Sequence, residues 1–215
     1  MLALDIDGTV IDYESEITRE NRDAILLAQE SGVQVVFCTG RGVLGAAQIE
    51  ESLQVRSPMV LRNGARLKNP YDGRVIREVP LPFPIVLRMI KLLEEFGLAP
   101  ICYQDKLKGF KAVLPKSSLR DKIVKKYYQK WSKKMILVDS LAQSPVKSIA
   151  SISVYYPRYQ YLDNVRRLIN ILFPGYTTYI YKLGHLRQLE IFCSGVSKWT
   201  GLKHLLGQWG IEKED

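Results

Sequence analysis

Short apolar runs and amphipathic stretches alternate along the first third of the chain. The apolar runs of strand length are residues 1–4, 33–38 and 59–61. The stretches with apolar side chains at helical spacing are residues 18–29 and 43–53. Strand, helix and strand in this order predict a βαβ unit, and such a unit requires a parallel sheet.

The first of these helices has recognisable end signals. Thr18 is the expected N-cap, and Gly32 stands just beyond the last helical residue. We expect Ala24, Leu27 and Ala28 to form the buried face of this helix, because they share one side at helical spacing.

A second region begins where prolines punctuate the chain at positions 80, 82 and 84. Its expected helices are residues 85–96, 117–131 and 160–173, and its expected strands are residues 100–103, 110–114, 147–156 and 176–181. A strand over residues 188–193 and a helix from residue 198 then return to the first region. We therefore expect an α/β core formed by residues 1–81 and 185–215, interrupted by an inserted α/β domain over residues 82–184.

The composition is that of an ordinary globular protein. Of the 215 residues, 47% are hydrophobic and 25% are charged. No apolar run approaches the ~20 residues of a membrane span, and two aspartates interrupt the N-terminus too early for a signal peptide. Cys38, Cys102 and Cys193 are odd in number and lie in apolar runs, which favours reduced thiols and a cytoplasmic location.

Positive charge is concentrated in the inserted region. Residues 82–184 hold 18 Lys and Arg against 6 Asp and Glu, whereas the rest of the chain carries a small negative charge. The plainest interpretation is a solvated lysine face, which we prefer to a nucleic-acid partner. Attraction of anionic phosphate substrates is the other open interpretation.

Two carboxylates follow the first apolar run. Asp5 and Asp7 are two residues apart, and Gly8 then interrupts the strand pattern. Residues two apart on a strand face the same side, so both carboxylates would lie at the carboxyl end of the strand, where parallel sheets bind ligands. Two carboxylates that close require a divalent cation or a shared proton. An ordinary strand end with an Asx-turn is the alternative.

Three further motifs could join this pair. Thr39-Gly40-Arg41 follows the second strand, where a hydroxyl and glycine amides can cradle an anion or simply cap a helix. Asn63-Gly64 is first of all a turn signal. Lys198 begins the last helix, a position at which a lysine is ordinarily just exposed to solvent.

Taken together, the motifs resemble the haloacid dehalogenase (HAD) superfamily of phosphohydrolases, and within it the Cof-like sugar phosphatases with a type IIB cap. The matching segments are Asp5-Ile-Asp7-Gly-Thr-Val10, Thr39-Gly40-Arg41, Asn63-Gly64-Ala65, Glu190-Ile191 and Gly195-Val-Ser-Lys198, with Trp199 replacing a small residue. The resemblance implies a Rossmann-like parallel-sheet core with an inserted α/β cap that chooses the leaving group. It also implies a Mg2+-dependent phosphate monoester hydrolase for a small phosphorylated metabolite, sugar phosphates being favoured.

The same resemblance assigns roles to residues. Asp5 would be the nucleophile and Asp7 the general acid/base. Thr39 would bind the transferring phosphoryl group, and Lys198 would neutralise charge. The implied phosphate or substrate neighbours are Gly8, Thr9, Gly40, Arg41 and Asn63. Asp5, the main-chain carbonyl of Asp7 and a later acidic residue would hold the Mg2+.

One family motif is missing. No Gly-Asp pair follows Lys198, and the chain stops at Glu212-Lys-Glu-Asp215. We expect a weakened metal site and a core sheet with one bare side. Two alternatives stay open: a phosphotransferase or mutase that uses the same aspartyl-phosphate, and a catalytically impaired binding or regulatory protein, which the missing motif favours. The oligomeric state is also left open.

Overall fold

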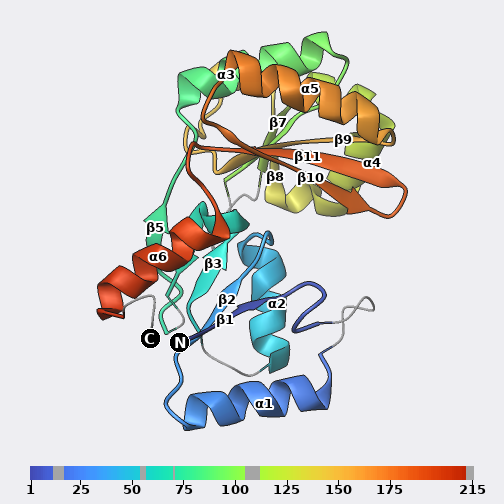
Figure 1. The fold of residues 1–215 in the computed structure, drawn as a ribbon. Helices are drawn as coiled ribbons and strands as arrows, with labels where there is room; N and C mark the ends of the chain where they lie inside the picture. Colours follow the sequence, from blue (N-terminus) through green and yellow to red (C-terminus); the bar gives the residue numbers. More distant parts are fainter. Residues whose placement is uncertain (12–16, 54–56, 70, 105–111, 212–215) are drawn as a thin grey trace. The chain divides into compact units, whose positions relative to one another are not determined.

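The computed structural model describes residues 1–11, 17–53, 57–69, 71–104 and 112–211. The chain divides into two compact units (Figure 1). One comprises Met1–Glu78 and Val196–Asp215, and the other comprises Val79–Gly195. Each unit has its own sheet and its own hydrophobic core.

The first unit has a sheet that begins as a βαβ arrangement. Its described elements are β1 (Leu2–Asp5), α1 (Arg19–Glu30), β2 (Val35–Cys38), α2 (Val43–Leu53), β3 (Met59–Leu61), β4 (Arg66–Lys68), β5 (Val75–Glu78) and α6 (Lys198–Trp209). The strand order is β1-β2-β3-β4-β5. Strands β1, β2 and β3 are parallel, whereas β4 and β5 pair antiparallel. The predicted parallel α/β core is therefore confirmed.

Helices cover both faces of this sheet. On one face, Ile25 of α1 and Ala46 and Ile49 of α2 belong to one buried cluster with alternate residues of β2 and β3. On the other face, Leu205 of α6 packs in a cluster with Val60 of β3. The sheet thus lies between two layers of helices. This arrangement is needed because β2 and β3 are apolar on both faces.

The predicted buried face of α1 is wrong for Ala24 and Leu27, which are exposed, and right for Ala28, which packs against the buried cluster. Thr18 is the N-cap as expected, its hydroxyl accepting a hydrogen bond from the Asn21 amide. However, Leu27 is 64% exposed, and Ile25 is the residue that the helix buries. Residues 24–28 are all apolar, so the spacing alone could not decide which side of the helix faces the sheet.

Strand β1 lies at the edge of its sheet. Within the described residues it pairs with β2 alone, and Leu2 is 39% exposed. An unpaired strand edge leaves main-chain donors and acceptors available to a further strand.

The second unit is built on a larger, mainly antiparallel sheet. Its described elements are α3 (Phe83–Glu95), β6 (Ile101–Tyr103), β7 (Ala112–Pro115), α4 (Lys122–Trp131), β8 (Met135–Val138), β9 (Ser151–Tyr156), α5 (Tyr159–Leu172), β10 (Thr177–Leu183) and β11 (Leu186–Phe192). The strand order is β10-β11-β9-β6-β7-β8, with β7 and β8 parallel. Helices α3 and α5 pack on one face of this sheet, and α4 packs on the other.

Two features of the second unit differ from the sequence-based expectation. Strand β8 was not predicted. Strand β11, assigned to the first region, pairs instead with β9 and β10. Its alternation of apolar and polar residues predicts a strand but carries no information about which sheet the strand joins. Residues 110–111 of one expected strand and the terminal residues 212–215 lie outside the described residues.

No helix in the described ranges is both long enough and apolar enough to cross a membrane.

Candidate active site

The carboxyl end of β1 brings Asp5 against a lysine from the other end of the chain. Asp5 is the last residue of β1, and Nζ of Lys198 lies 2.7 Å from its Oδ2 atom. The other carboxylate oxygen accepts a hydrogen bond from the Ile6 amide at 2.8 Å. Both side chains are partly open to solvent, at 45% for Asp5 and 37% for Lys198. The predicted nucleophile therefore has an accessible carboxylate and a cation beside it.

Lys198 occupies this place because of how α6 begins. Ser197 is the N-cap of α6, and its side chain and that of Thr200 form a reciprocal capping box. Gly201, one turn further, lies so close to β3 that an added Cβ would be 2.6 Å from Cγ1 of Val60. The first turn of α6 is thus held closely against β3, and the Lys198 side chain extends from it to Asp5 at the carboxyl end of β1.

Asp7 is bound by an arginine of the next loop. Nη2 of Arg41 lies 2.7 Å from Oδ1 of Asp7, and Nε lies 3.1 Å from each carboxylate oxygen. The Thr39 hydroxyl is 3.5 Å from Oδ2 of Asp7, at the outer limit for a hydrogen bond. Strand β1 ends at Asp5, so Asp7 lies in the turn that follows and not on the strand itself. Both aspartates are nevertheless exposed, whereas Ile6 between them is buried.

The loop after β2 supplies hydrogen-bond donors beside these carboxylates. Thr39 follows Cys38, which is the register partner of Asp5 in the parallel pair. Its buried hydroxyl accepts a hydrogen bond from the Arg41 amide at 3.0 Å and keeps its own proton to donate. Among the described residues, the Gly40 amide has no hydrogen-bond partner. A hydroxyl and a neighbouring open amide form a suitable seat for one phosphate oxygen.

Asn63 lies directly against this loop. Its amide donates to the Thr39 carbonyl at 3.0 Å, and its side chain is within 3.4 Å of where a Cβ on Gly40 would be. The predicted turn is present, since β3 and β4 pair antiparallel around a single 3-10 turn over Arg62–Gly64. Asn63 itself has a positive φ of 52°. It is buried, so its contact with the site passes through the Thr39-Gly40 loop.

Gly8 and Thr9 belong to the turn that carries Asp7. The Gly8 amide donates to the Ile11 carbonyl at 2.9 Å, and the Thr9 amide donates to the Ile6 carbonyl at 3.3 Å. Both amides are therefore engaged inside the turn. Gly8 also adopts a positive φ of 78°, which a side chain would strain. Binding of phosphate by these two residues stays a prediction, whereas their part in shaping the turn is visible.

The register partner of Asp5 on β2 is Cys38, whose thiol is buried. Burial raises the pKa of the Cys38 thiol to about 11; the charge of Lys198 lowers this pKa and that of Asp5 raises it. Cys38 is thus a buried thiol that stays protonated near neutral pH, and its pKa depends on the charges of Lys198 and Asp5. The expectation of reduced cysteines agrees with three free thiols.

The two aspartates suit a divalent cation of the Mg2+ type. Their carboxylate oxygens are hard ligands, and Mg2+ is commonly held by one or two carboxylates together with phosphate oxygens and water. In the described part of the chain, no third Asp, Glu, His or Cys gathers with them. The residues present can supply part of a Mg2+ coordination shell, with oxygens of water or of a bound phosphate completing it.

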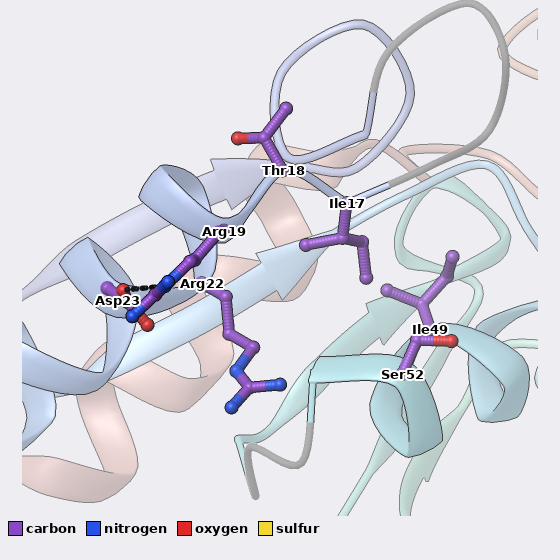
Figure 2. Close-up of a pocket in the computed structure, with 7 residues that line it drawn as sticks. All are labelled: Ile17, Thr18, Arg19, Arg22, Asp23, Ile49 and Ser52. Carbon is purple, nitrogen blue, oxygen red and sulfur yellow. Dashed lines mark ion pairs between the residues drawn. The ribbon is translucent and has the colours of Figure 1, made fainter.

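A hollow lies elsewhere in the same unit, beside the start of α1. Figure 2 shows its lining residues, which are Ile17, Thr18, Arg19, Arg22, Asp23, Ile49 and Ser52. Arg19 pairs with Asp23 at 3.5 Å on its wall. The described lining includes none of the predicted site residues, so this hollow is separate from the Asp5–Asp7 site.

Sequence reasoning missed the residues that bring α6 to the site. Gly64 belongs to the Asn63-Gly64 turn and Gly201 to α6, and the close contacts of both glycines join segments more than a hundred positions apart. The one usable signal was a glycine inside a helical pattern, which often marks close backbone approach.

Two curated relatives carry phosphatase names. The 5-amino-6-(5-phospho-D-ribitylamino)uracil phosphatase YcsE of Bacillus subtilis is 39% identical over 67 residues, which are 31% of this chain and 27% of that protein. The pyridoxal phosphate phosphatase YbhA of Escherichia coli is 27% identical over 105 residues, 49% of this chain and 39% of that protein. The chain thus spans about a third of the length of the curated relatives it matches.

Solved structures reproduce the fold over nearly the whole chain. A haloacid dehalogenase-like hydrolase from Bacteroides thetaiotaomicron superposes with a TM-score of 0.77 at 21% identity, covering 99% of this chain and 78% of the other. A sugar phosphatase of HAD subclass IIB superposes with a TM-score of 0.73 at 17% identity, covering 98% and 76%. At such identities, the likeness establishes the fold alone.

The sequence as a whole matches one family model, which describes haloacid dehalogenase-like hydrolases. The match runs over residues 2–215 and so includes every segment that forms the site. The chain belongs to the haloacid dehalogenase-like hydrolase family.

Proposed function

We propose that this chain hydrolyses phosphate monoesters, with Asp5 as the nucleophile. The observation that carries the proposal is the meeting of three distant segments at one sheet edge. There, Asp5 contacts Lys198 while Asp7 contacts Arg41 and Thr39. Membership of a hydrolase family and the phosphatase names of the relatives support the same reaction.

The reaction would proceed in two displacements. A carboxylate oxygen of Asp5 attacks phosphorus, an acyl phosphate forms on Asp5, and the bond from phosphorus to the ester oxygen breaks. Asp7, in its protonated form, gives its proton to the departing alkoxide. It then removes a proton from the water that attacks the phosphoryl group, which regenerates free Asp5 and releases phosphate.

The other residues would bind the phosphoryl group and balance its charge. The Thr39 hydroxyl and the Gly40 amide donate to one phosphoryl oxygen. Lys198 holds the Asp5 carboxylate in position and offsets charge on the transferring group. Donors fixed before the reaction are effective because they need no reorganisation in the transition state.

Mg2+ would add to this set of residues. Asp5 and the turn at Asp7 are the groups that would hold it, and when bound it would offset negative charge on the phosphoryl oxygens. The requirement for Mg2+ is part of the proposal.

We infer a small phosphorylated metabolite as the substrate. The relatives' names refer to a ribityl phosphate and to pyridoxal phosphate, and a structural neighbour is described as a sugar phosphatase. A phosphorylated sugar or sugar-like alcohol is the class that these names favour.

The test is turnover of p-nitrophenyl phosphate, measured with and without Mg2+. Asp5→Asn should abolish turnover, because an amide is a poor nucleophile. Asp23→Asn, which removes an exposed carboxylate from α1, is the matched control and should leave the rate unchanged. Full activity of Asp5→Asn would remove Asp5 from its proposed role.

A second measurement tests the covalent step. Quenching during turnover should yield a chain that is heavier by one phosphoryl group, on the peptide that contains Asp5. Asp7→Ala should slow both half-reactions. If the modified chain accumulates in no variant, the reaction proceeds by direct attack of water.

A further inference from the structure

Arg41 holds Asp7, the proposed acid/base, in a tight ion pair. Its guanidinium makes three contacts with Asp7, at 2.7, 3.1 and 3.1 Å, and they engage both carboxylate oxygens. Such forked arginine–carboxylate pairs are stronger than single contacts and fix the geometry of both partners. In this arrangement, both oxygens of the Asp7 carboxylate are occupied by contacts with Arg41.

The site as a whole is electrically balanced. Asp5 is matched by Lys198, and Asp7 is matched by Arg41. A divalent cation that approached the two carboxylates would therefore also meet two positive charges at close range. Repulsion between like charges at such distances weakens cation binding considerably.

Arg41 is also beside the donors that would receive a phosphate. Its own amide donates to the Thr39 hydroxyl oxygen at 3.0 Å, and that oxygen is 3.5 Å from the Asp7 carboxylate that the guanidinium holds. An oxyanion seated on the Thr39 hydroxyl and the Gly40 amide would thus compete with Asp7 for the same guanidinium. The Arg41 carbonyl is fixed by the Arg62 amide at 3.1 Å, so the side chain can change partner while its backbone stays in place.

We propose that Arg41 is an exchangeable counter-ion, which pairs with Asp7 until an oxyanion binds and then pairs with that oxyanion. The transfer frees the Asp7 carboxylate for proton transfer. It also removes positive charge from the place where a divalent cation would bind, so oxyanion and cation bind cooperatively. The inference rests on the proposed function for the identity of the oxyanion, but it concerns binding and needs no turnover.

The experiment measures Mg2+ binding by calorimetry, with and without inorganic phosphate. In the unmodified chain, phosphate should tighten Mg2+ binding. Arg41→Gln should bind Mg2+ about two- to fivefold more tightly than the unmodified chain in the absence of phosphate, the range expected from removing one partly exposed charge pair. The same variant should bind phosphate more weakly, and phosphate should enhance its Mg2+ affinity less.

Two controls separate charge from general effects. Arg41→Lys keeps the positive charge and should leave Mg2+ affinity close to that of the unmodified chain. Arg74→Gln removes an exposed arginine that pairs with Asp72, and it should change neither affinity. Arg41→Met repeats the charge removal with a different side chain if Arg41→Gln does not fold.

Mg2+ affinity that is equal or weaker in Arg41→Gln and Arg41→Met, or absent in all variants, would overturn the inference. The two proposals fail separately. If the chain does not cleave p-nitrophenyl phosphate but the Arg41 variants bind Mg2+ more tightly, the counter-ion proposal is supported and the phosphatase proposal is refuted. If the chain is active but its Mg2+ affinity is unchanged by substitution of Arg41, the phosphatase proposal is supported and the counter-ion proposal is refuted.

Discussion

The carbonyl oxygen of Ser197 lies where Gly64 leaves room for it: a Cβ on Gly64 would be 2.0 Å from that oxygen. Gly64 also has a φ of 101°, a conformation that disfavours any side chain. This contact seats the first turn of α6 on the turn that follows β3. Because Lys198 is the next residue after Ser197, the Gly64–Ser197 contact also determines where the lysine beside Asp5 stands.

Gly64→Ala should destabilise the protein strongly. The new methyl group would meet main-chain atoms that cannot move aside cheaply, in addition to the strain of a positive φ. We expect a loss of about 3–4 kcal/mol in the free energy of unfolding, measured by denaturant titration. Gly32→Ala is the matched control, since Gly32 has a φ of 81° but nothing within 4 Å of an added Cβ.

The control should cost about 1–2 kcal/mol, the ordinary penalty of a left-handed residue. The difference between the two variants isolates the contact with Ser197. Equal losses for Gly64→Ala and Gly32→Ala would mean that the first turn of α6 is not held tightly against this turn.

Local patterns predicted the elements that carry the site. Asp5 and Thr39 follow apolar runs of strand length, and parallel strands bring such ends to one edge whatever else the chain does. That argument needed no information from distant parts of the sequence. The first forty residues alone were therefore enough to predict that the segments around Asp5 and Thr39 lie together.

The placement of Lys198 required something that local patterns lack. A lysine at the start of a helix is ordinarily exposed to solvent, and its assignment depended on matching a family motif. The structure supplies the physical reason in the close packing of Gly64 and Gly201, which joins segments far apart in sequence. Strand β11 was predicted to join the wrong sheet for the same reason: tertiary contacts, which local patterns do not reveal, determine the pairing partners of a strand.

The Cys38 thiol should resist alkylation in the folded protein. With its pKa raised to about 11 by burial, Cys38 holds roughly one thiolate per thousand molecules at pH 8. Its labelling by iodoacetamide, followed by peptide mass analysis, should therefore rise about 100-fold between pH 8 and pH 10. A rate that levels off near pH 9 would instead mean that labelling passes through the unfolded chain.

The same raised pKa makes this thiol a source of alkaline instability. The folded state binds the thiol proton more tightly than the unfolded chain does. The stabilisation is therefore complete below about pH 8.5 and is lost as pH rises toward about 11. Cys38→Ala should flatten the fall in unfolding free energy over that range, and Cys193→Ala serves as the control for loss of a thiol.

In the second unit, Asp121 is the clearest local stabiliser of a helix end. Its carboxylate accepts hydrogen bonds from the amides of Ile123 and Val124, at 2.8 and 2.9 Å, at the start of α4. Asp121→Ala should cost about 1 kcal/mol of stability, whereas Asp121→Asn, which keeps an accepting oxygen, should cost less than half of that. Circular dichroism during thermal unfolding would check both, and equal losses would contradict the capping role.

Lys198→Met should separate activity from stability most sharply. The Asp5–Lys198 pair is partly exposed, at 45% and 37%, so water already screens it and its loss should change the free energy of unfolding by less than about 1 kcal/mol. If Lys198 offsets charge on the transferring phosphoryl group, turnover of p-nitrophenyl phosphate should nevertheless fall about 100-fold or more. Lys203→Met removes an exposed lysine from the same helix and should leave both quantities unchanged.

Cys38 provides a readout of the same variant that does not depend on turnover. The charge of Lys198 lowers the pKa of this thiol, so removing the lysine should raise that pKa and slow alkylation further at every pH. Asp5 acts in the opposite sense, so Asp5→Asn should speed alkylation. A variant that lost activity without slowing alkylation would show that the lysine acts elsewhere than beside Asp5, and the arrangement of the site would have to be revised.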